Sequence, residues 1–429
     1  MFQTIINAFK IKEVRNKILI TIALIFVYRL GCYIPVPGVK AFSGLENYSF
    51  LQIMNAVSGS ALQYGTFFAM GIGPYINASI IIQLLSVGIP ALERLSKQGE
   101  EGRRRLNTYT RLLTLFLAIA QAIGILVTFG EEGIKFEQLF GVDEFSKFLG
   151  YAFLVVVYTA GAALTMWIGE RITDYGVSNG ISLLIFAGIL SSAGTSIYTM
   201  ITGLFVEATA LTSMWQLIGF ILVAILIFGA IVTVDSAERK IPVQYAKQVK
   251  GRKMYGGQST HIPIKVNASG VMPLIFAFSI LSFPDLIVNL LGWPTSWWSR
   301  NVGTQSWLYV VLLCLLILFF SYFYNQIQFN PDDISKSIQG NGGFIPGTRP
   351  GKPTADYLKR VSNRITLFGA IFLALLALIP TIIFKAIGGM GLANVFTATG
   401  LLIIVSVALE FEQALQSQIM MKNYKGFLK

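Results

Sequence analysis

Long apolar runs constrain the fold of this chain more than any other feature. The clearest is IGFILVAILIFGAIVTV over residues 218–234, and others are ILITIALIFVY (18–28), FLVVVY (153–158) and VVLLCLLILFF (310–320). Hydrophobic residues make up 54% of the chain and charged residues only 13%, which is far below the charged fraction of a soluble domain. Because a backbone in lipid must satisfy its own hydrogen bonds, runs of this length form helices. We therefore predict an all-α polytopic membrane protein.

Ten transmembrane helices are predicted from these runs and from the turn residues between them. They cover residues 18–34, 72–88, 107–129, 151–169, 180–199, 215–235, 269–291, 305–325, 365–384 and 395–412. Residues 1–17 precede them as an amphipathic basic segment, and residues 413–429 follow as a basic tail. No small-residue cleavage site follows the first apolar run, so we do not expect a removable signal peptide.

The Lys and Arg residues predict the orientation of the chain in the membrane. Of the 33 in the sequence, the loops on one side hold only Lys40, Lys135, Lys147, Arg300 and Lys385. Nearly all the others lie in the N-terminal segment, the tail and the alternate loops. Cytoplasmic loops carry such an excess, so both termini and the large basic loops are expected in the cytoplasm.

Two of the basic loops are longer than orientation requires. Residues 236–268 and 326–364 each contain turn signals, among them NGG, IPG, RPG and GKP. Long loops in a compact protein are usually functional or disordered. Their positive charge and aromatic residues favour docking of an acidic partner, RNA or anionic lipid.

A short span interrupted by Gly and Pro occurs twice. Residues 71–90 read GIGPYINASIIIQLLSVGIP and residues 266–284 read VNASGVMPLIFAFSILSFP. They belong to the second and seventh spans, which are equivalent positions if residues 18–199 and 200–412 form two five-helix halves of opposite topology. Paired interrupted spans in an inverted repeat point to a central pathway. The alternative is two ordinary spans with prolines at their ends.

Polar residues inside the spans are uncharged near the middle of the membrane. Asn77, Ser79, Gln83 and Gln121 must face protein or water, because lipid cannot satisfy their hydrogen bonds. Ionisable residues lie towards span ends instead, at Arg29, Asp235, Asp285 and Glu410. An ion-coupled secondary transporter with broken helices is the main alternative function, and it is disfavoured because such transporters keep ionisable groups at the midplane.

No catalytic or metal-binding constellation is present in the sequence. His261 is the single histidine, and Cys32 and Cys314 are isolated thiols without metal-ligand spacing. The string GTRPGKPT (347–354) lacks the spacing of a phosphate-binding loop. We therefore expect no cofactor, no metal and no enzyme activity, and we expect the energy source to be a partner. A passive channel remains, in which the small weakly apolar segment 55–70 forms either a helix within a funnel or a surface re-entrant loop.

Five ordered motifs closely resemble the SecY family of protein-translocation channels. They are GIGPYINASIIIQLL (71–85), EEGRRRLNTYTR (100–111), YGVSNGISLLIFAGI (175–189), QSTHIPIKVNASGVMPLIFA (258–277) and FNPDDISKSIQGNGGFIPGTRPG (329–351). The resemblance runs along the whole chain. It implies two pseudo-symmetric inverted halves around a central hourglass pore in the bacterial inner membrane. Unfolded secretory chains would pass through the pore, and membrane segments would leave sideways between the second and seventh helices.

The resemblance also implies roles for particular residues along the pathway. A ring of aliphatic side chains closes the pore of the family, and its positions here are Ile76, Ile80, Ile181, Ile185, Ile275 and Ile403. A plug outside the ring would span residues 55–67 and include Asn55, Ser58, Gly59, Ser60, Ala61, Leu62, Tyr64 and Phe67. The lateral gate would include Ile82, Gln83, Gln121, Ser282 and Phe283. Periodicity alone would assign the isoleucines to ordinary core packing.

Docking residues and partners follow from the same resemblance. The cytoplasmic loops of the family bind the ribosome, including its RNA, or the motor ATPase SecA, and the small membrane subunits SecE and SecG complete the channel. The matching basic positions are Arg239, Lys240, Arg252, Lys253 and Arg349. Lys240 and Lys253 stand where relatives can carry arginine, which phosphate contacts tolerate and bidentate contacts do not.

Overall fold

The protein is described by a computed structural model in which most residues are helical. The described residues are 2–42, 49–133, 144–203, 210–245, 248–250, 253–255, 259–267, 270–290, 298, 301–302, 306–386 and 398–426. A helix lies at each of the ten predicted spans. Their bounds are α2 Lys12–Gly31, α4 Gly73–Gly88, α6 Glu100–Gly133, α8 Glu144–Tyr175, α9 Gly180–Gly203, α10 Ala210–Asp235, α11 Met272–Leu290, α13 Trp307–Gln328, α15 Lys352–Ala386 and α17 Ala398–Gly426.

Fewer than ten of these helices are long and apolar enough to count as complete membrane spans. Within the described residues, five helices are long and apolar enough, and α4 together with α5 (Pro90–Lys97) makes up to six. The helices α9, α10 and α11 contribute shorter apolar segments. The polytopic helical fold is therefore confirmed, whereas the count of ten spans stays a prediction.

The interrupted second span is a short helix that ends in a sharp bend. Pro74 lies in the first turn of α4, and Pro90 begins α5 after Ile89, whose backbone is extended. The two helices are bent by 102° at this point. Proline has no backbone N–H, so it starts a helix readily and cannot continue one. In the seventh span, Pro284 lies inside α11.

The two long basic loops fold together into a small sheet-containing unit, which the sequence does not predict. Strand β1 (Glu238–Tyr245) pairs antiparallel with β4 (Ser259–Lys265) on one side and with β5 (Gly343–Phe344) on the other. A second hairpin joins β2 (Gln248–Lys250) to β3 (Lys253–Tyr255). Helix α14 (Pro331–Gly340) and the start of α15 close over the sheet. Their shared core contains Ile241, Val243, Ile264, Ile338, Ile345 and Leu358.

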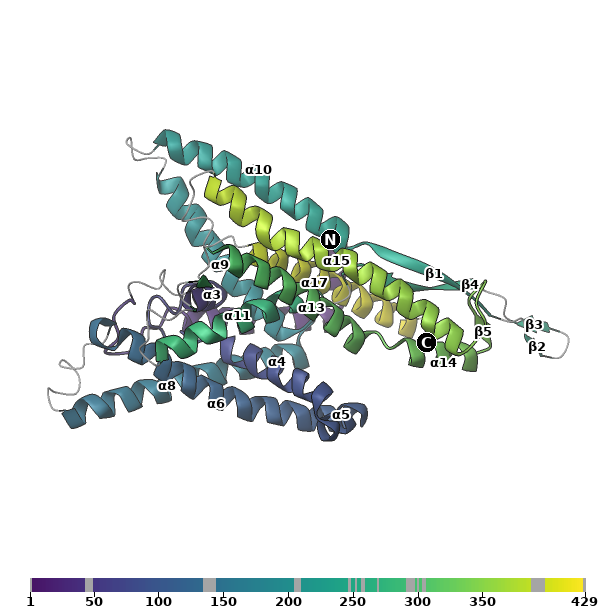
Figure 1. Ribbon diagram of the computed structural model, residues 1–429, viewed down its shortest axis with the longest axis horizontal. Helices are drawn as coiled ribbons and strands as arrows, with labels where there is room; N and C mark the ends of the chain where they lie inside the picture. Colours follow the sequence, from purple (N-terminus) through teal and green to yellow (C-terminus); the bar gives the residue numbers. More distant parts are fainter. Residues whose placement is uncertain are drawn as a thin grey trace.

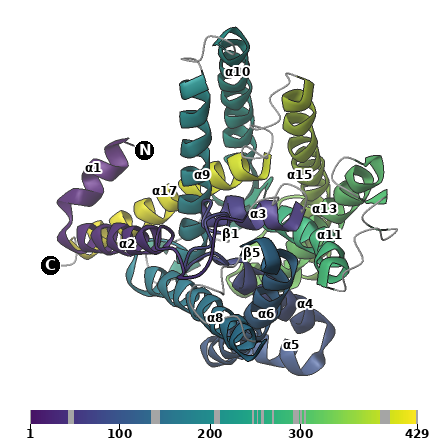
Figure 2. The ribbon, with the colours of Figure 1, turned by 90° about the vertical axis from the view of Figure 1, so that its left-hand side faces the viewer.

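The molecule is elongated, and its strands lie at one end. In Figure 1 the strands and α14 lie towards the right-hand end, where the C-terminus is also marked, and α5 lies at the ends of α4 and α6 that are nearer to the strands. Helix α1 (Phe2–Lys10) packs against α17, which extends into the region expected to be a tail. Figure 2 shows α3 (Ser49–Ser58) near the middle of the helices, and α3 contacts both α9 and α11. The segment predicted as a plug is thus placed among helices of both halves.

Candidate functional site

A central cavity of about 460 Å³ brings together five of the six predicted ring isoleucines. Ile76 comes from α4, Ile181 and Ile185 from α9, Ile275 from α11, and Ile403 from α17. Residues four apart on a helix share one face, so α9 presents two isoleucines to the same space. Four helices that are distant in sequence therefore supply one aliphatic lining.

The sixth predicted ring residue, Ile80, lies beside the cavity. Its side chain is only 4% exposed, and it belongs to a large apolar cluster formed mainly by α11, α13 and α15. Ile76 and Ile275 contact that cluster and also the cluster that contains Ile185 and Ile403. These two isoleucines therefore connect the packing of the two predicted halves at the ring.

One side of the cavity is polar, and among its residues the sequence predicts only Ser79 and Gln83 to face protein or water. Its lining includes Gln83 and Ser86 of α4 and Arg103, Asn107 and Thr110 near the start of α6. These positions lie close to α5 and to the first turns of α6, and α5 lies towards the strand-bearing end in Figure 1. The cavity therefore runs from the isoleucines towards the basic end of the molecule. For the α6 part of this lining, the sequence signal is the spacing of Asn107 and Thr110, three apart on one helix face.

The predicted lateral gate lies between α4 and α6 on one side and α11 on the other. Ile82 and Gln83 are half-buried and line the cavity. Gln121 of α6 is 3% exposed, and within the described residues its Oε1 has no hydrogen-bond partner. Helix α6 contacts α11 directly. The side chains of Ser282 and Phe283 lie outside the described residues, so their gate assignment stays a prediction.

The segment predicted as a plug is a short helix followed by a tight turn. The backbone N–H of Ser60 donates to the Asn55 carbonyl (2.8 Å), and that of Gln63 donates to Asn55 Oδ1 (3.0 Å). Gly59 and Ser60 both have positive φ, 70° and 68°, a conformation that glycine adopts without strain. Ala61 and Leu62 are buried, whereas 57% of Tyr64 is exposed. Phe67 is half-buried and stacks at a tilt on Phe68.

Most of the predicted docking residues lie on the sheet-containing unit. Arg239 is exposed on β1 opposite Ile264, and Lys240 forms an ion pair with Glu238 (3.2 Å). Arg349 is exposed in the loop that joins β5 to α15. Arg252 lies outside the described residues, and Lys253 lies on β3 but its side chain is not described. Because β5 pairs with β1, the two loops that carry Arg239 and Arg349 are parts of one surface.

The backbone around Arg349 is held by two buried hydroxyl groups. Ser335 Oγ on α14 donates to the Gly351 carbonyl (2.7 Å), and Thr354 Oγ1 donates to the Arg349 carbonyl (2.8 Å). Ser335 and Thr354 are 3% and 2% exposed. The loop is therefore fixed to α14 and to the start of α15, which leaves the Arg349 side chain free to face solvent.

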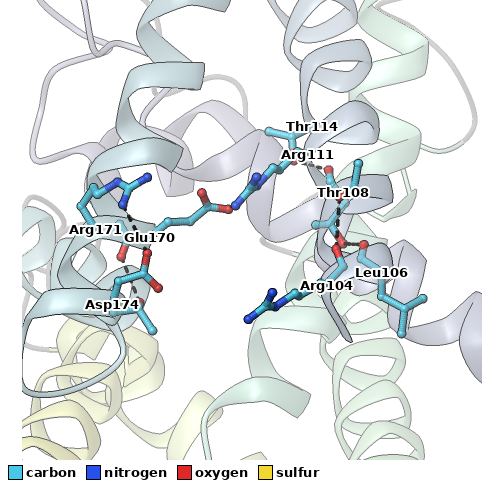
Figure 3. A network of polar contacts seen from close by, with 11 residues as sticks. Arg104, Leu106, Thr108, Arg111, Thr114, Glu170, Arg171 and Asp174 are labelled. Atoms are coloured by element: carbon cyan, nitrogen blue, oxygen red, sulfur yellow. Dashed lines mark hydrogen bonds and ion pairs between the residues drawn. The ribbon is translucent and has the colours of Figure 1, made fainter. Parts of the chain in front are cut away.

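An ion pair joins α6 to α8 beside the cavity (Figure 3). Arg111 Nε donates to Glu170 Oε1 at 2.8 Å. The next residue of α8, Arg171, pairs with Asp174 of the same helix at 3.6 Å and lies over the rings of Trp167 and Tyr175. The Arg111–Glu170 pair ties α6 to α8, whereas the contacts of Arg171 lie within α8.

The architecture corresponds to one class of membrane protein, the protein-conducting channels. The solved structure entitled "The structure of a protein conducting channel" is similar with a TM-score of 0.68 over 94% of this chain and 92% of that chain, at 20% identity. The structure "Sec61 in the Canine ribosome-channel complex from the endoplasmic reticulum" is similar with a TM-score of 0.63 at 18% identity, over 94% of this chain and 92% of that chain. At these identities the similarity establishes the fold.

Sequence comparison defines the family within that class. The model of the SecY family matches residues 66–412. The chain is 42% identical to the protein translocase subunit SecY of Corynebacterium glutamicum, over 99% of both chains. It is also 42% identical to that of Streptomyces coelicolor, over 100% of both chains. The chain belongs to the SecY family, as its motifs predicted.

Proposed function

We propose that this chain is a passive channel through which unfolded polypeptides cross the membrane. The observation that carries the proposal is the central cavity, in which isoleucines of α4, α9, α11 and α17 converge beside a polar lining. Stiff β-branched side chains make a tight constriction, and an apolar constriction excludes water and ions when closed. The polar lining then forms the cytoplasmic entrance to the constriction.

Lateral release of membrane segments is the finer part of this proposal. The seam would open between α4 and α6 on one side and α11 on the other. The bend at Ile89 supports this role, because α4 can tilt as a short unit without moving α5 and α6 along the same axis. Gln121 supports it as well, because a buried amide oxygen without a partner weakens the closed seam.

Partners supply the driving force in this proposal. Solved relatives include a Sec61 channel with a ribosome and a yeast Ssh1 complex bound to the 80S ribosome. We propose that the surface carrying Arg239, Lys240 and Arg349 binds the ribosome, including its RNA, or the SecA motor. We further propose that SecE and SecG complete the channel, that anionic lipids surround it, and that it lies in the bacterial inner membrane with both termini cytoplasmic. The chain itself then catalyses no reaction.

Disulfide crosslinking to a stalled substrate tests the pathway. Single cysteines are placed at Ile76 and Ile275 after Cys32 and Cys314 are replaced, and a secretory chain with one cysteine is stalled in the channel. We expect crosslinks at both positions and none at a matched control, Ile225→Cys, whose native side chain is 67% exposed on α10. If the chain is demonstrably stalled and neither ring position reacts, the cavity is not the path of the polypeptide.

A further inference from the structure

Arg29 joins the plug helix to two helices of the first half. Its Nη1 donates to the carbonyl oxygen of Ser58 (3.4 Å), the last residue of α3, and its Nη2 donates to Ser191 Oγ of α9. The guanidinium also lies over the Tyr33 ring, 5.5 Å from its centre. Although Arg29 lies near the end of the predicted first span, its donors point into the protein. An ionisable residue held within a membrane protein in this way indicates a functional role.

The chemistry of the contact suits the end of a helix. The last carbonyls of a helix lack backbone N–H partners within it and carry its negative dipole end. Arg29 supplies a positive charge there, and Ser192 Oγ donates to the neighbouring Ala56 carbonyl (3.1 Å). A planar guanidinium with several donors can bond two acceptors in different directions. Gly59 permits the approach, because a Cβ at this residue would overlap Arg29 Nη1.

The hydrogen bonds at the end of α3 are directed to one half of the molecule. Arg29 lies on α2, and Ser191 and Ser192 lie on α9, all in the predicted first half. Helix α3 also contacts α11 of the second half. When the two halves separate, α3 loses its contacts with α11 and keeps its hydrogen bonds to α2 and α9. Release of the plug then requires that Arg29 lose one of its two acceptors.

We infer that Arg29 is a positioning residue that holds the plug seated on α9 and thereby keeps the resting channel closed. This inference rests on the proposed plug role of residues 55–67. A charge-assisted hydrogen bond is among the stronger polar contacts in proteins, and Arg29 is half-buried, so the loss of one acceptor costs free energy. Arg29 therefore favours the seated plug over the displaced one.

Ion conductance of the assembled channel in planar bilayers tests the inference. For Arg29→Gln we expect the plug-displaced population, and with it the resting conductance, to rise at least about tenfold. Arg171→Gln is the matched control, because Arg171 is also a span-end arginine over an aromatic ring but pairs within its own helix. We expect its conductance to match that of the wild type. Arg29→Lys keeps the charge and should give an intermediate conductance.

A labelling measurement reports on the plug itself. Ala61 is 1% exposed, so a cysteine at this position reacts slowly with a membrane-impermeant thiol reagent while the plug is seated. In a background without Cys32 and Cys314, Arg29→Gln should speed its labelling and Arg171→Gln should not. Should Arg29→Gln fail to assemble, Ser191→Ala removes the α9 acceptor by a smaller change and should raise both readouts in the same direction.

The outcomes of these experiments distinguish the role of Arg29 from the role of the plug. Wild-type conductance and labelling in Arg29→Gln, in a system where deletion of residues 55–67 makes the channel leak, would overturn the role of Arg29 and leave the plug intact. A deletion channel that stays closed would overturn the plug assignment, and the role of Arg29 with it. An equal rise in Arg171→Gln would show general destabilisation and would also overturn the inference.

Discussion

At the scale of single residues, the cavity depends on side-chain shape. The isoleucines of α4, α9, α11 and α17 present branched, stiff side chains to one small space. No side chain of this group carries charge or a hydrogen-bonding group, so water gains little by entering between them. These isoleucines can therefore close the gap between the four helices, and they can separate again without breaking a polar contact.

Removing two of these side chains should open the constriction to ions. We expect Ile76→Gly combined with Ile403→Gly to give a steady ion conductance in planar bilayers where the wild type gives little, because a wider apolar gap admits water. The double change also removes packing, at a cost of about 2–5 kcal/mol per buried aliphatic side chain. Assembly of the variant is therefore checked by gel filtration before conductance is measured.

Ile225→Gly is the control for the effect of introducing glycine into a helix. This residue is 67% exposed on α10, so its substitution weakens a helix without touching the cavity. Conductance at the wild-type level in the control and a leak in the double variant would support the constriction. If neither the double variant nor Ile225→Gly conducts ions, Ile76 and Ile403 do not form the constriction.

At the scale of elements, α3 and α9 are in backbone contact. A Cβ at Gly188 of α9 would overlap the carbonyl oxygen of Val57 in α3. The same helix carries Gly194, where an added Cβ would meet nothing within 4 Å. Close approach of a helix to the plug thus depends on one glycine of α9, and the second glycine has no such role.

Alanine at these two glycines should have effects of opposite sign. Gly188→Ala should lower the free energy of unfolding by about 1–3 kcal/mol, because the new methyl group is overpacked against backbone. Gly194→Ala should raise it by about 0.5–1 kcal/mol, because glycine is unfavourable inside a helix. Thermal unfolding of the two purified variants measures this difference. A Gly188→Ala protein as stable as Gly194→Ala would contradict the close packing of α3 on α9.

At the scale of the whole molecule, basic loops distant in sequence form one surface at one end. The net charge is +12, and the strands and α14 lie towards the same end in Figure 1. Arg349 projects from the loop after β5, and buried hydroxyls of α14 and α15 hold that loop in place. The proposed docking of a partner therefore rests on a rigid, positively charged end of the molecule.

Reversing the charge of Arg349 should block motor-driven transport without unfolding the protein. We expect Arg349→Glu to abolish translocation of a secretory precursor into vesicles, with membrane insertion and thermal stability unchanged, because the side chain is exposed. Lys147→Glu is the control, since Lys147 is exposed at the start of α8 in the predicted outer region. Normal translocation by Arg349→Glu, or an equal loss in the control, would refute the docking role.

The sequence by itself determined the helical membrane fold, the places of the helices and the family. Apolar length, proline positions and Lys and Arg distribution are local properties of the chain, and a membrane converts them directly into helices and orientation. The helix break at Pro90 could be predicted for the same reason, because proline restricts its own backbone and removes its own N–H donor. The strands of residues 238–265 carried only a short alternation around Ile241 and Val243, which was too brief to predict a sheet.

Only the tertiary structure decided which of these local features share a site. It placed isoleucines of four helices around one cavity, excluded Ile80 from its lining and added Asn107 and Thr110. It also showed that Arg29, which the sequence places only towards a span end, makes a contact between α2, α3 and α9. Such groupings depend on how helices far apart in sequence pack together. The same apolar periodicity fits a core residue and a pore residue equally, so packing alone separates them.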